Sequence, residues 1–275
     1  MIILPPLCYA SNIITIERKF IMKDTIYTIP LTEAFNAQDE CPFCFISRKL
    51  EQDAISFILG AAYMEDDIRA VTDKMGFCKE HYKKMYDYGN RLGNALILHT
   101  HYIALQKELA KQIEAYTPSK ASFFDKFKKT KTIDTAEHNS ISDWVDAQNK
   151  SCYICDYIDT NFVRYMDTFF YLYSSTPDFK KLFNESKGFC LPHFGNLMRL
   201  SHTKISDKDK PEFYNTLFKL TQANLKRIEE DLSWFIDKYD YRNKDADWKN
   251  SKDAIPRGMQ KLASGYVQDP PFKEK

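Results

Sequence analysis

The motif CPFC at residues 41–44 is followed by MGFCKEH at residues 75–81, and related motifs recur later as CYIC at 152–155 and KGFCLPH at 187–193. Between the last Cys of the first motif and the Cys of the second lie 33 residues in the first copy and 34 in the second. The offset between the copies is 111 residues for the first motif and 112 for the second, so one inserted residue explains the difference. Self-similarity at a fixed period indicates a repeated structural unit. We therefore expect two tandem repeats.

Both copies show the three- and four-residue spacing of apolar side chains that is typical of amphipathic helices. In the first copy we expect one helix from Pro42 to Tyr63 and a short one over 66–74. A third helix begins near Cys78, and a long fourth helix ends at Tyr116. In the second copy the corresponding ranges are 152–173, 178–186, 190–202 and 211–239. No segment alternates between polar and apolar residues for long enough to predict a strand. The predicted fold class is all-α.

These patterns predict five parts of the chain: an N-terminal arm over 1–28, helical repeat 1 over 29–116, a linker over 117–140, helical repeat 2 over 141–240 and a C-terminal extension over 241–275. Because the first 21 residues do not join the helical pattern, we expect translation to start at Met22. The alternative is a genuine but loosely ordered arm. The C-terminal extension is expected to wrap around the second repeat or to fray.

The linker carries basic side chains interleaved with aromatic ones, namely Lys126, Lys128, Lys129 and Lys131 with Phe123, Phe124 and Phe127. This pattern is compatible with contacts to phosphate groups or RNA. Four lysines are few in a chain that is neutral as a whole. We therefore favour a solvated linker with some of its aromatic side chains docked on a neighbouring helix.

Six of the seven cysteines lie in the repeated motifs, and the seventh, Cys8, lies in the N-terminal arm. Each copy offers Cys-x-x-Cys and Cys-x-x-His, which is the ligand number, type and pair spacing of a closed tetrahedral zinc site. The predicted ligands are Cys41, Cys44, Cys78 and His81 for the first repeat, and Cys152, Cys155, Cys190 and His193 for the second. We thus expect two helical repeats, each held by its own Cys3His site.

Local sequence places these ligands at the starts of helices, where Pro42 follows the first Cys and Gly76 precedes the third. Helix N-termini carry partial positive charge, which stabilises thiolates. Structural zinc contributes roughly 10–16 kcal/mol of apparent binding free energy, comparable with the net stability of about 5–15 kcal/mol of a typical domain. We therefore expect Cys78→Ser or chelation to loosen the first repeat and to leave the second folded.

Two other uses of these cysteines stay open. An iron–sulfur cluster is the stronger alternative, because Cys-Pro is frequent at such sites and three Cys with one His can hold a cluster. Thiol–disulfide chemistry is the weaker one, because a redox CxxC motif needs a preceding strand in a βαβ unit and residues 32–40 are a polar approach to a helix.

The chain shows no visible catalytic signature. Nucleotide-binding, acyl-transfer and metalloprotease motifs are absent from the sequence. His99 and His101 lie at i,i+2 and would point to different sides of a helix, and the acidic residues 65–67 are best explained as helix capping. We expect a non-enzymatic binding or scaffold protein, with an iron–sulfur or thiol-based redox protein as the alternative.

Charge and hydropathy limit the partners. The chain has 39 basic and 38 acidic residues, so it lacks the positive field that attracts nucleic acid or anionic membranes. Its longest apolar stretches fall short of the roughly 18 residues of a membrane helix, and its first 20 residues make a poor signal peptide. We expect a cytoplasmic protein that binds a protein or a small ligand, neither membrane nor nucleic acid. The 17 Tyr and 20 Phe residues point to an exposed aromatic groove between the repeats.

The motifs resemble those of an uncharacterised bacterial family, a domain of unknown function, in which a Cys-x-x-Cys helix is followed after about 30 residues by Gly-Phe-Cys-x-x-His, often twice. The resemblance covers Ile29 to Tyr239 and rests on Cys41, Cys44, Gly76, Phe77, Cys78, His81, Cys152, Cys155, Gly188, Phe189, Cys190 and His193. The second copy has Tyr153 where the first has Pro42. Because the family has no established activity, the resemblance implies only the repeat and the ligand assignment.

Overall fold

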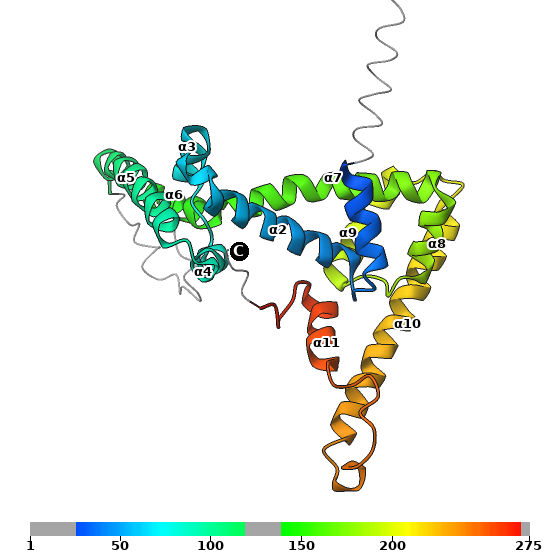
Figure 1. Cartoon of the computed structure of the whole chain (residues 1–275). Coiled ribbons are helices and arrows are strands. Elements are labelled where there is room, and N and C mark those ends of the chain that lie inside the picture. The colour runs from blue at the N-terminus through cyan, green and yellow to red at the C-terminus, as the bar shows by residue number, and fades with distance from the viewer. Residues whose placement is uncertain (1–25, 119–138, 271–275) are drawn as a thin grey trace, which may run out of the picture. The chain divides into compact units, whose positions relative to one another are not determined.

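The computed structural model describes residues 26–118 and 139–270 (Figure 1). Within these ranges the regular structure is entirely helical and contains no strand. The all-α prediction is confirmed. Met22, Cys8 and the linker residues Phe123, Phe124, Phe127, Lys126, Lys128, Lys129 and Lys131 lie outside the described ranges.

The described part of the first half begins with a helix over residues 26–36. It continues with α2 (Pro42–Gly60), the 3-10 helix η1 (Ala62–Met64), α3 (Asp66–Met75), α4 (Lys79–Tyr88) and α5 (Arg91–Ala115). The second half contains α6 (Ser140–Lys150), α7 (Tyr153–Ser175), α8 (Pro177–Glu185), α9 (Leu191–Lys204), α10 (Lys210–Asp237), η4 (Tyr241–Asn243) and α11 (Ala254–Ala263).

Eight of these helices, α2 to α5 and α7 to α10, lie close to where the apolar spacing predicts them. The helix over 26–36, α6 and α11 were not predicted. The start of α6 is fixed by a local capping box, in which Asn139 accepts hydrogen bonds from the backbone of Ile141 and Ser142 and the Ser142 hydroxyl accepts one from the Asn139 N–H. That signal lies at the end of a segment whose composition resembles a linker, so composition concealed the helix.

The described residues form two compact units, and these differ from the predicted repeats over 29–116 and 141–240. Of the described residues, unit 1 contains 26–50 together with Asp159–Asp269, and unit 2 contains 51–118, 139–158 and Pro270. The boundaries fall inside α2 and α7, so each of these helices contributes residues to both units. A compact unit therefore does not correspond to one sequence repeat.

Unit 1 has an aromatic core. Phe35, Phe43, Phe169, Phe183 and Phe213 are each at most 1% exposed. The Phe169 ring packs edge-on against Phe43 and Phe183, with centroids 5.5 and 5.7 Å away, which is a favoured geometry for aromatic pairs. Part of the high aromatic content of the chain therefore lies in this core, and the aromatic content does not by itself indicate a binding groove.

Unit 2 has a smaller core. It is built largely from the end of α2, from the segment around the Gly-Phe-Cys motif at 76–78, and from the Cys-x-x-Cys motif at 152–155. Its buried members are Ala54, Ile55, Ile58, Leu59, Phe77, Met85, Tyr88, Ile97, Cys152 and Ile154. The last turns of α2 thus share one core with Phe77, which precedes Cys78, and with the start of α7.

The C-terminal extension is ordered over its described part. Helix α11 packs against α10 and α9 within unit 1, so the expected wrapping around elements of the second repeat is found. Among the described residues, every helix is too short or too polar to cross a bilayer.

Candidate metal centres

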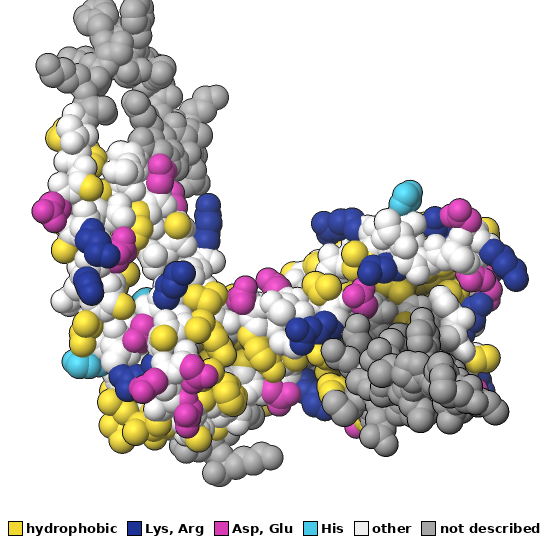
Figure 2. Space-filling view, turned by 90° about the horizontal axis from the view of Figure 1, so that it is seen from above, with side chains coloured by type: hydrophobic (Ala, Val, Ile, Leu, Met, Phe, Trp, Pro, Cys, Tyr) yellow, Lys and Arg dark blue, Asp and Glu magenta, His cyan; other side chains and the backbone are white. Residues whose placement is uncertain are grey.

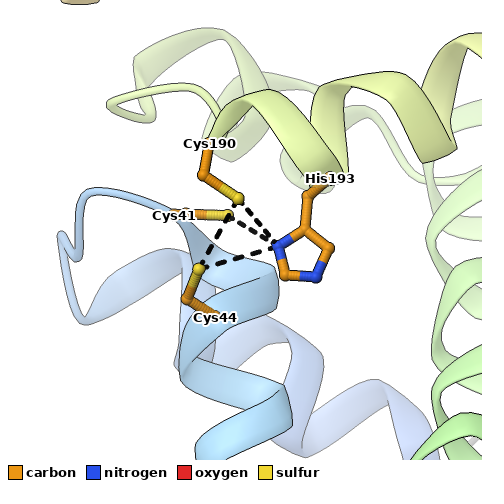
Figure 3. Close-up of side chains that lie close together, drawn as sticks. All are labelled: Cys41, Cys44, Cys190 and His193. Atoms are coloured by element: carbon orange, nitrogen blue, oxygen red, sulfur yellow. Dashed lines mark hydrogen bonds between the residues drawn. The ribbon is translucent and has the colours of Figure 1, made fainter. Parts of the chain in front are cut away.

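Unit 1 brings together Cys41, Cys44, Cys190 and His193, a cluster that we call site A (Figure 3). The Nδ1 atom of His193 lies 3.3, 3.6 and 3.1 Å from the Sγ atoms of Cys41, Cys44 and Cys190. The sulfurs of Cys44 and Cys190 are 3.7 Å apart. All four side chains are buried and point toward a common centre.

Unit 2 brings together Cys78, His81, Cys152 and Cys155, which we call site B. The Nδ1 atom of His81 lies 3.2 Å from the Sγ atoms of both Cys78 and Cys152, and 3.4 Å from that of Cys155. The sulfurs of Cys78 and Cys155 are 3.9 Å apart. His81 and Cys152 are buried, whereas Cys78 and Cys155 are partly exposed.

These separations fit four ligands around one ion. Zinc–sulfur bonds of about 2.3 Å and zinc–nitrogen bonds of about 2.05 Å in a tetrahedron place two sulfurs about 3.8 Å apart, and a sulfur and a nitrogen about 3.6 Å apart. The observed sulfur–sulfur distances of 3.7 and 3.9 Å match, and the sulfur–nitrogen distances of 3.1–3.6 Å are equal or slightly shorter. Each site is therefore able to hold one metal ion with its own four donors.

The eight predicted ligands all belong to these sites, but the predicted grouping is wrong. Cys41 and Cys44 were expected with Cys78 and His81, and they lie instead with Cys190 and His193. The Cys-x-x-Cys pair at 152–155 likewise joins the Cys-x-x-His pair of the other repeat. Each site is thus shared between the two sequence repeats.

Helix length explains the exchange. Helix α2 has 19 residues and is about 28 Å long, with Cys41 and Cys44 at its start. The 10 residues of α3 span only about 15 Å and cannot retrace that length. The chain therefore reaches Cys78 near the end of α2, where the start of α7 supplies the remaining ligands.

The prediction that the ligands lie at helix N-termini is confirmed. Cys41 and Cys152 directly precede α2 and α7, while Cys78 and Cys190 are the N-cap residues of α4 and α9. The second ligand of each pair lies three residues later in the first turn, on the same side of the helix. At each site the partial positive charge of two helix N-termini therefore faces the thiolates, from α2 and α9 at site A and from α4 and α7 at site B.

The glycine of each Gly-Phe-Cys motif is required by its backbone conformation. Gly76 has φ 61° and ψ −157°, a region that is nearly restricted to glycine, and Gly188 has φ 69°. At site B the carbonyl of Gly76 accepts a hydrogen bond from the Tyr153 N–H at 3.0 Å, which joins the two segments that carry the ligands.

We predict that Gly76→Ala destabilises unit 2 by at least about 1–3 kcal/mol through backbone strain. The added Cβ would also lie 2.9 Å from two atoms of the His101 ring, so that ring must move. Thermal unfolding measures the effect. The control is Gly60→Ala at the end of α2, where no atom lies within 4 Å of the new Cβ, and where a change of about 0.4–1 kcal/mol in the stabilising direction is expected. Equal stability of the two variants would contradict the prediction.

An outer partner fixes the histidine of site B. The Nε2 atom of His81 lies 3.1 Å from Oε1 of Glu51, and the Glu51 carboxylate also accepts hydrogen bonds from Lys84 at 2.6 and 2.7 Å. Burial would raise the pKa of Glu51, but the hydrogen bonds from His81 and Lys84 lower it overall. A carboxylate on the far nitrogen of a ligating histidine orients the ring and increases its basicity.

We predict that Glu51→Gln weakens metal binding at site B by about 10–100-fold and leaves site A unchanged. Competition with a chromogenic chelator follows the release of metal from each site as a separate step, and so measures the affinity of both sites. The matched control is Glu108→Gln on α5, an exposed carboxylate paired with Lys111 at 2.9 Å, which should change neither step. Two unshifted steps in the Glu51 variant would show that this carboxylate does not act on the site.

Site A is enclosed by the C-terminal extension instead. The Nζ atom of Lys261 donates hydrogen bonds to the backbone carbonyls of Glu40 and Lys187, at 2.5 Å each. Those carbonyls precede Cys41 and the Gly-Phe-Cys190 turn, so one buried ammonium group joins both ligand-bearing segments. Asp39, which accepts a hydrogen bond from the Cys41 N–H, is held in turn by Tyr266 at 2.8 Å.

Aromatic rings complete the environment of His193. The ring of Phe162 stacks on the imidazole with centroids 5.1 Å apart, and Phe43 packs edge-on at 5.8 Å. This packing fixes the ring plane of His193 and excludes water from that side of site A.

The charges at site B favour a cation among thiolates. Burial would raise the pKa of Cys152, but hydrogen bonds from His81 and from the backbone N–H groups of Cys155 and Cys78 lower it to about 6. Burial would lower the pKa of His81, but contacts with Cys152 and Glu51 raise it to about 10. The cluster thus stabilises positive charge beside a thiolate, and a bound divalent ion would supply such charge.

The same balance holds at site A. Burial would lower the pKa of His193, but hydrogen bonds with Cys190 and Cys44 raise it to about 9. Hydrogen bonds from Cys190 and Cys41 hold the pKa of Cys44 well below its usual range. Burial raises the pKa of the Cys41 thiol at site A and of the Cys155 thiol at site B, so each site combines one thiol of lowered pKa with one of raised pKa.

The remaining candidate residues have structural contacts. The Nδ1–H of His101 donates a hydrogen bond to the Asp73 carbonyl at 2.7 Å, and His99 is exposed on α5. Asp66 and Asp67 lie in the first turn of α3, where they oppose its dipole. Glu51 and Lys261 are the functional residues that sequence reasoning missed, since neither belongs to a recognisable motif.

Comparison with known proteins gives no match among curated proteins and none among solved structures. A family described as a family of unknown function, DUF6062, matches residues 22–269, a range that includes all eight ligands. This match agrees with the resemblance carried by the motifs. The chain belongs to the DUF6062 family.

Proposed function

We propose that the protein is a non-enzymatic scaffold that binds two structural zinc ions, one at site A and one at site B. The observation that carries the proposal is the closed donor set of each site, whose four ligand atoms all lie within 4.8 Å of one another. Structural zinc sites have four protein ligands, whereas catalytic zinc keeps a position open for water or substrate.

Ligand spacing favours a single ion over an iron–sulfur cluster. A cluster places several iron and sulfide atoms between its protein ligands, so those ligands lie farther apart than ligands of one ion. In both sites the thiols and the imidazole nitrogen are 3.1–3.9 Å apart. Three thiolates and one imidazole are also a ligand set that zinc commonly adopts.

The energetic role of the ions follows from the sequence separation of their ligands. Site A joins residues that are 146–152 positions apart, and site B joins residues 71–77 apart. Structural zinc contributes roughly 10–16 kcal/mol of apparent binding free energy. An ion that closes such long loops is therefore expected to hold together segments that the apolar cores alone position less firmly.

The proposal includes a cytoplasmic location, because thiolate ligands persist where thiols are kept reduced. All six cysteines of the described residues are free thiols. This chemistry fits a reducing compartment.

The proposed partner is a protein or a small ligand. On the face shown in Figure 2, Lys and Arg side chains are interspersed with Asp and Glu, and neither sign dominates a large area. Large apolar side chains are exposed in both units, including Ile236, Tyr239 and Tyr241 in unit 1 and Met64 and Leu92 in unit 2. Mixed charge with exposed apolar side chains is more typical of protein contacts than of nucleic-acid contacts.

Elemental analysis of protein purified without oxygen tests the metal assignment. We expect two zinc ions per chain and no absorption in the visible range. Prolonged chelation should then reduce helicity and lower the melting temperature. Iron with inorganic sulfide and absorption near about 400 nm would instead support the iron–sulfur alternative.

A further inference from the structure

A polar cavity of about 680 Å³ lies in unit 1, outside the ligand set of site A. Its lining comes from the turn at 185–187, from α10 at Asn224 and Arg227, and from residues 249–253 before α11, together with Arg257 in α11 and Glu40 before α2. Its volume falls within the range of about 300–1,000 Å³ that is typical of small-molecule sites. Because the lining is charged and polar, a ligand of this cavity has to be polar as well.

The cavity lining has more basic side chains than acidic ones. Its two arginines are already used, since Arg227 binds Glu40 at 2.5 Å and Arg257 binds Asp253 at 2.8 Å. The third lining carboxylate, Glu185, lies 3.9 Å from Lys181 outside the cavity. Each acidic group of the lining therefore has a basic partner.

Three lysines remain, namely Lys187, Lys249 and Lys252. Within the described part of the chain none of them forms an ion pair, and Lys249 lies over the Trp234 ring with its Nζ 4.0 Å from the centroid. The first turn of α11, with Lys252 and Asp253 before it, adds the partial positive charge of a helix N-terminus. Three lysines among the residues that line one cavity indicate an anionic ligand.

Phosphate is a common ligand of lysine, which binds its oxygens as a point charge, and the positive end of a helix also favours a phosphate group. A phosphate group would fill only part of the cavity and would leave room for an organic body. Asn250, on the same lining, is able to bond polar groups of that body.

We propose that this cavity binds a small organic phosphate through Lys187, Lys249 and Lys252. The site is separate from the zinc proposal, because none of its lining residues is a metal ligand. The proposal adds a small-molecule ligand to a protein whose other sites are structural.

Titration of the full-length, metal-loaded chain tests the proposal, with AMP, inorganic phosphate and uncharged adenosine as probes. Calorimetry gives the affinity, and Trp234 fluorescence is expected to change because Lys249 contacts its ring. We expect AMP to bind more tightly than inorganic phosphate, and adenosine not to bind. Absence of binding at millimolar AMP would overturn the proposal.

The triple variant Lys187→Gln, Lys249→Gln, Lys252→Gln should weaken AMP binding by about tenfold or more, as expected for losing at least one charged hydrogen bond. The matched control, Lys208→Gln, Lys219→Gln, Lys226→Gln, removes the same charge from exposed positions of unit 1 outside the cavity. Circular dichroism verifies that both variants fold. An equal loss in the control, or tighter binding of a single-stranded oligonucleotide than of AMP, would overturn the assignment to a small phosphate.

Discussion

Replacing Cys41 and Cys190 together by serine should remove one of the two proposed zinc ions per chain, whereas replacing Cys41 and Cys78 together should remove both. The reason is that Cys41 and Cys190 belong to the same site, while Cys41 and Cys78 belong to different ones. If each repeat instead held its own ion, the two double variants would give the opposite counts. Zinc content by elemental analysis of the two purified proteins measures the difference directly.

The same pair of variants should differ strongly in stability. Each lost ion removes an interaction of roughly 10–16 kcal/mol, so we expect the Cys41→Ser, Cys78→Ser protein to lose cooperative unfolding and much of its helicity. The Cys41→Ser, Cys190→Ser protein should keep the melting of unit 2, because site B retains all four ligands. The Cys78→Ser variant alone should accordingly loosen unit 2, which contains the whole of site B. Native-like melting of the protein that lacks both ions would contradict a structural role for the metals.

Replacing Lys261 by methionine should destabilise unit 1 by about 1–3 kcal/mol or more, the cost of leaving a buried acceptor without its donor, while Glu40 keeps its ion pair with Arg227. The Lys261 side chain is 2% exposed, and its Nζ lies 3.4 Å from Oε2 of Glu40 in addition to its two carbonyl contacts. Burial lowers the pKa of Lys261, and the nearby charges of Glu40 and Cys41 oppose that effect. Without the ammonium group, the carbonyls before Cys41 and before the Gly-Phe-Cys190 turn lose a shared donor.

Denaturant unfolding compares Lys261→Met with the control Lys49→Met, which removes an exposed lysine paired with Glu33 at 3.3 Å. Exposed pairs are worth less than about 1 kcal/mol, so the control should remain close to the parent protein. Chelator competition adds a second readout, in which only the release step of site A should become easier. Similar stabilities for the two variants would show that Lys261 does not organise the ligand segments.

The asymmetry between the sites has a chemical consequence. Site A is fully buried and closed by residues 260–266, whereas two thiols of site B are partly exposed and its histidine depends on Glu51. The two candidate sites thus offer the same ligand set in different surroundings. Any difference in their release rates reports on those surroundings and not on the donors.

The sequence by itself determined the local features of both sites. Ligands three residues apart share a face of one helical turn, so Cys41 with Cys44, or Cys190 with His193, could be recognised as pairs without any tertiary information. Pro42 and Gly76 marked the helix starts that carry the ligands, and apolar spacing located α2 to α5 and α7 to α10.

Only the tertiary structure decided which pairs meet. That choice depends on the lengths of α2 and α7 as rigid rods and on which ends pack into one core, as Leu59 does with Phe77 and Ile154. It also decided the outer partners, since Glu51 and Lys261 reach the sites through packing across 30 or more positions of sequence. The sequence repeat identifies each Cys-x-x-Cys and Cys-x-x-His pair. The lengths of the helices between them determine which two pairs form one site.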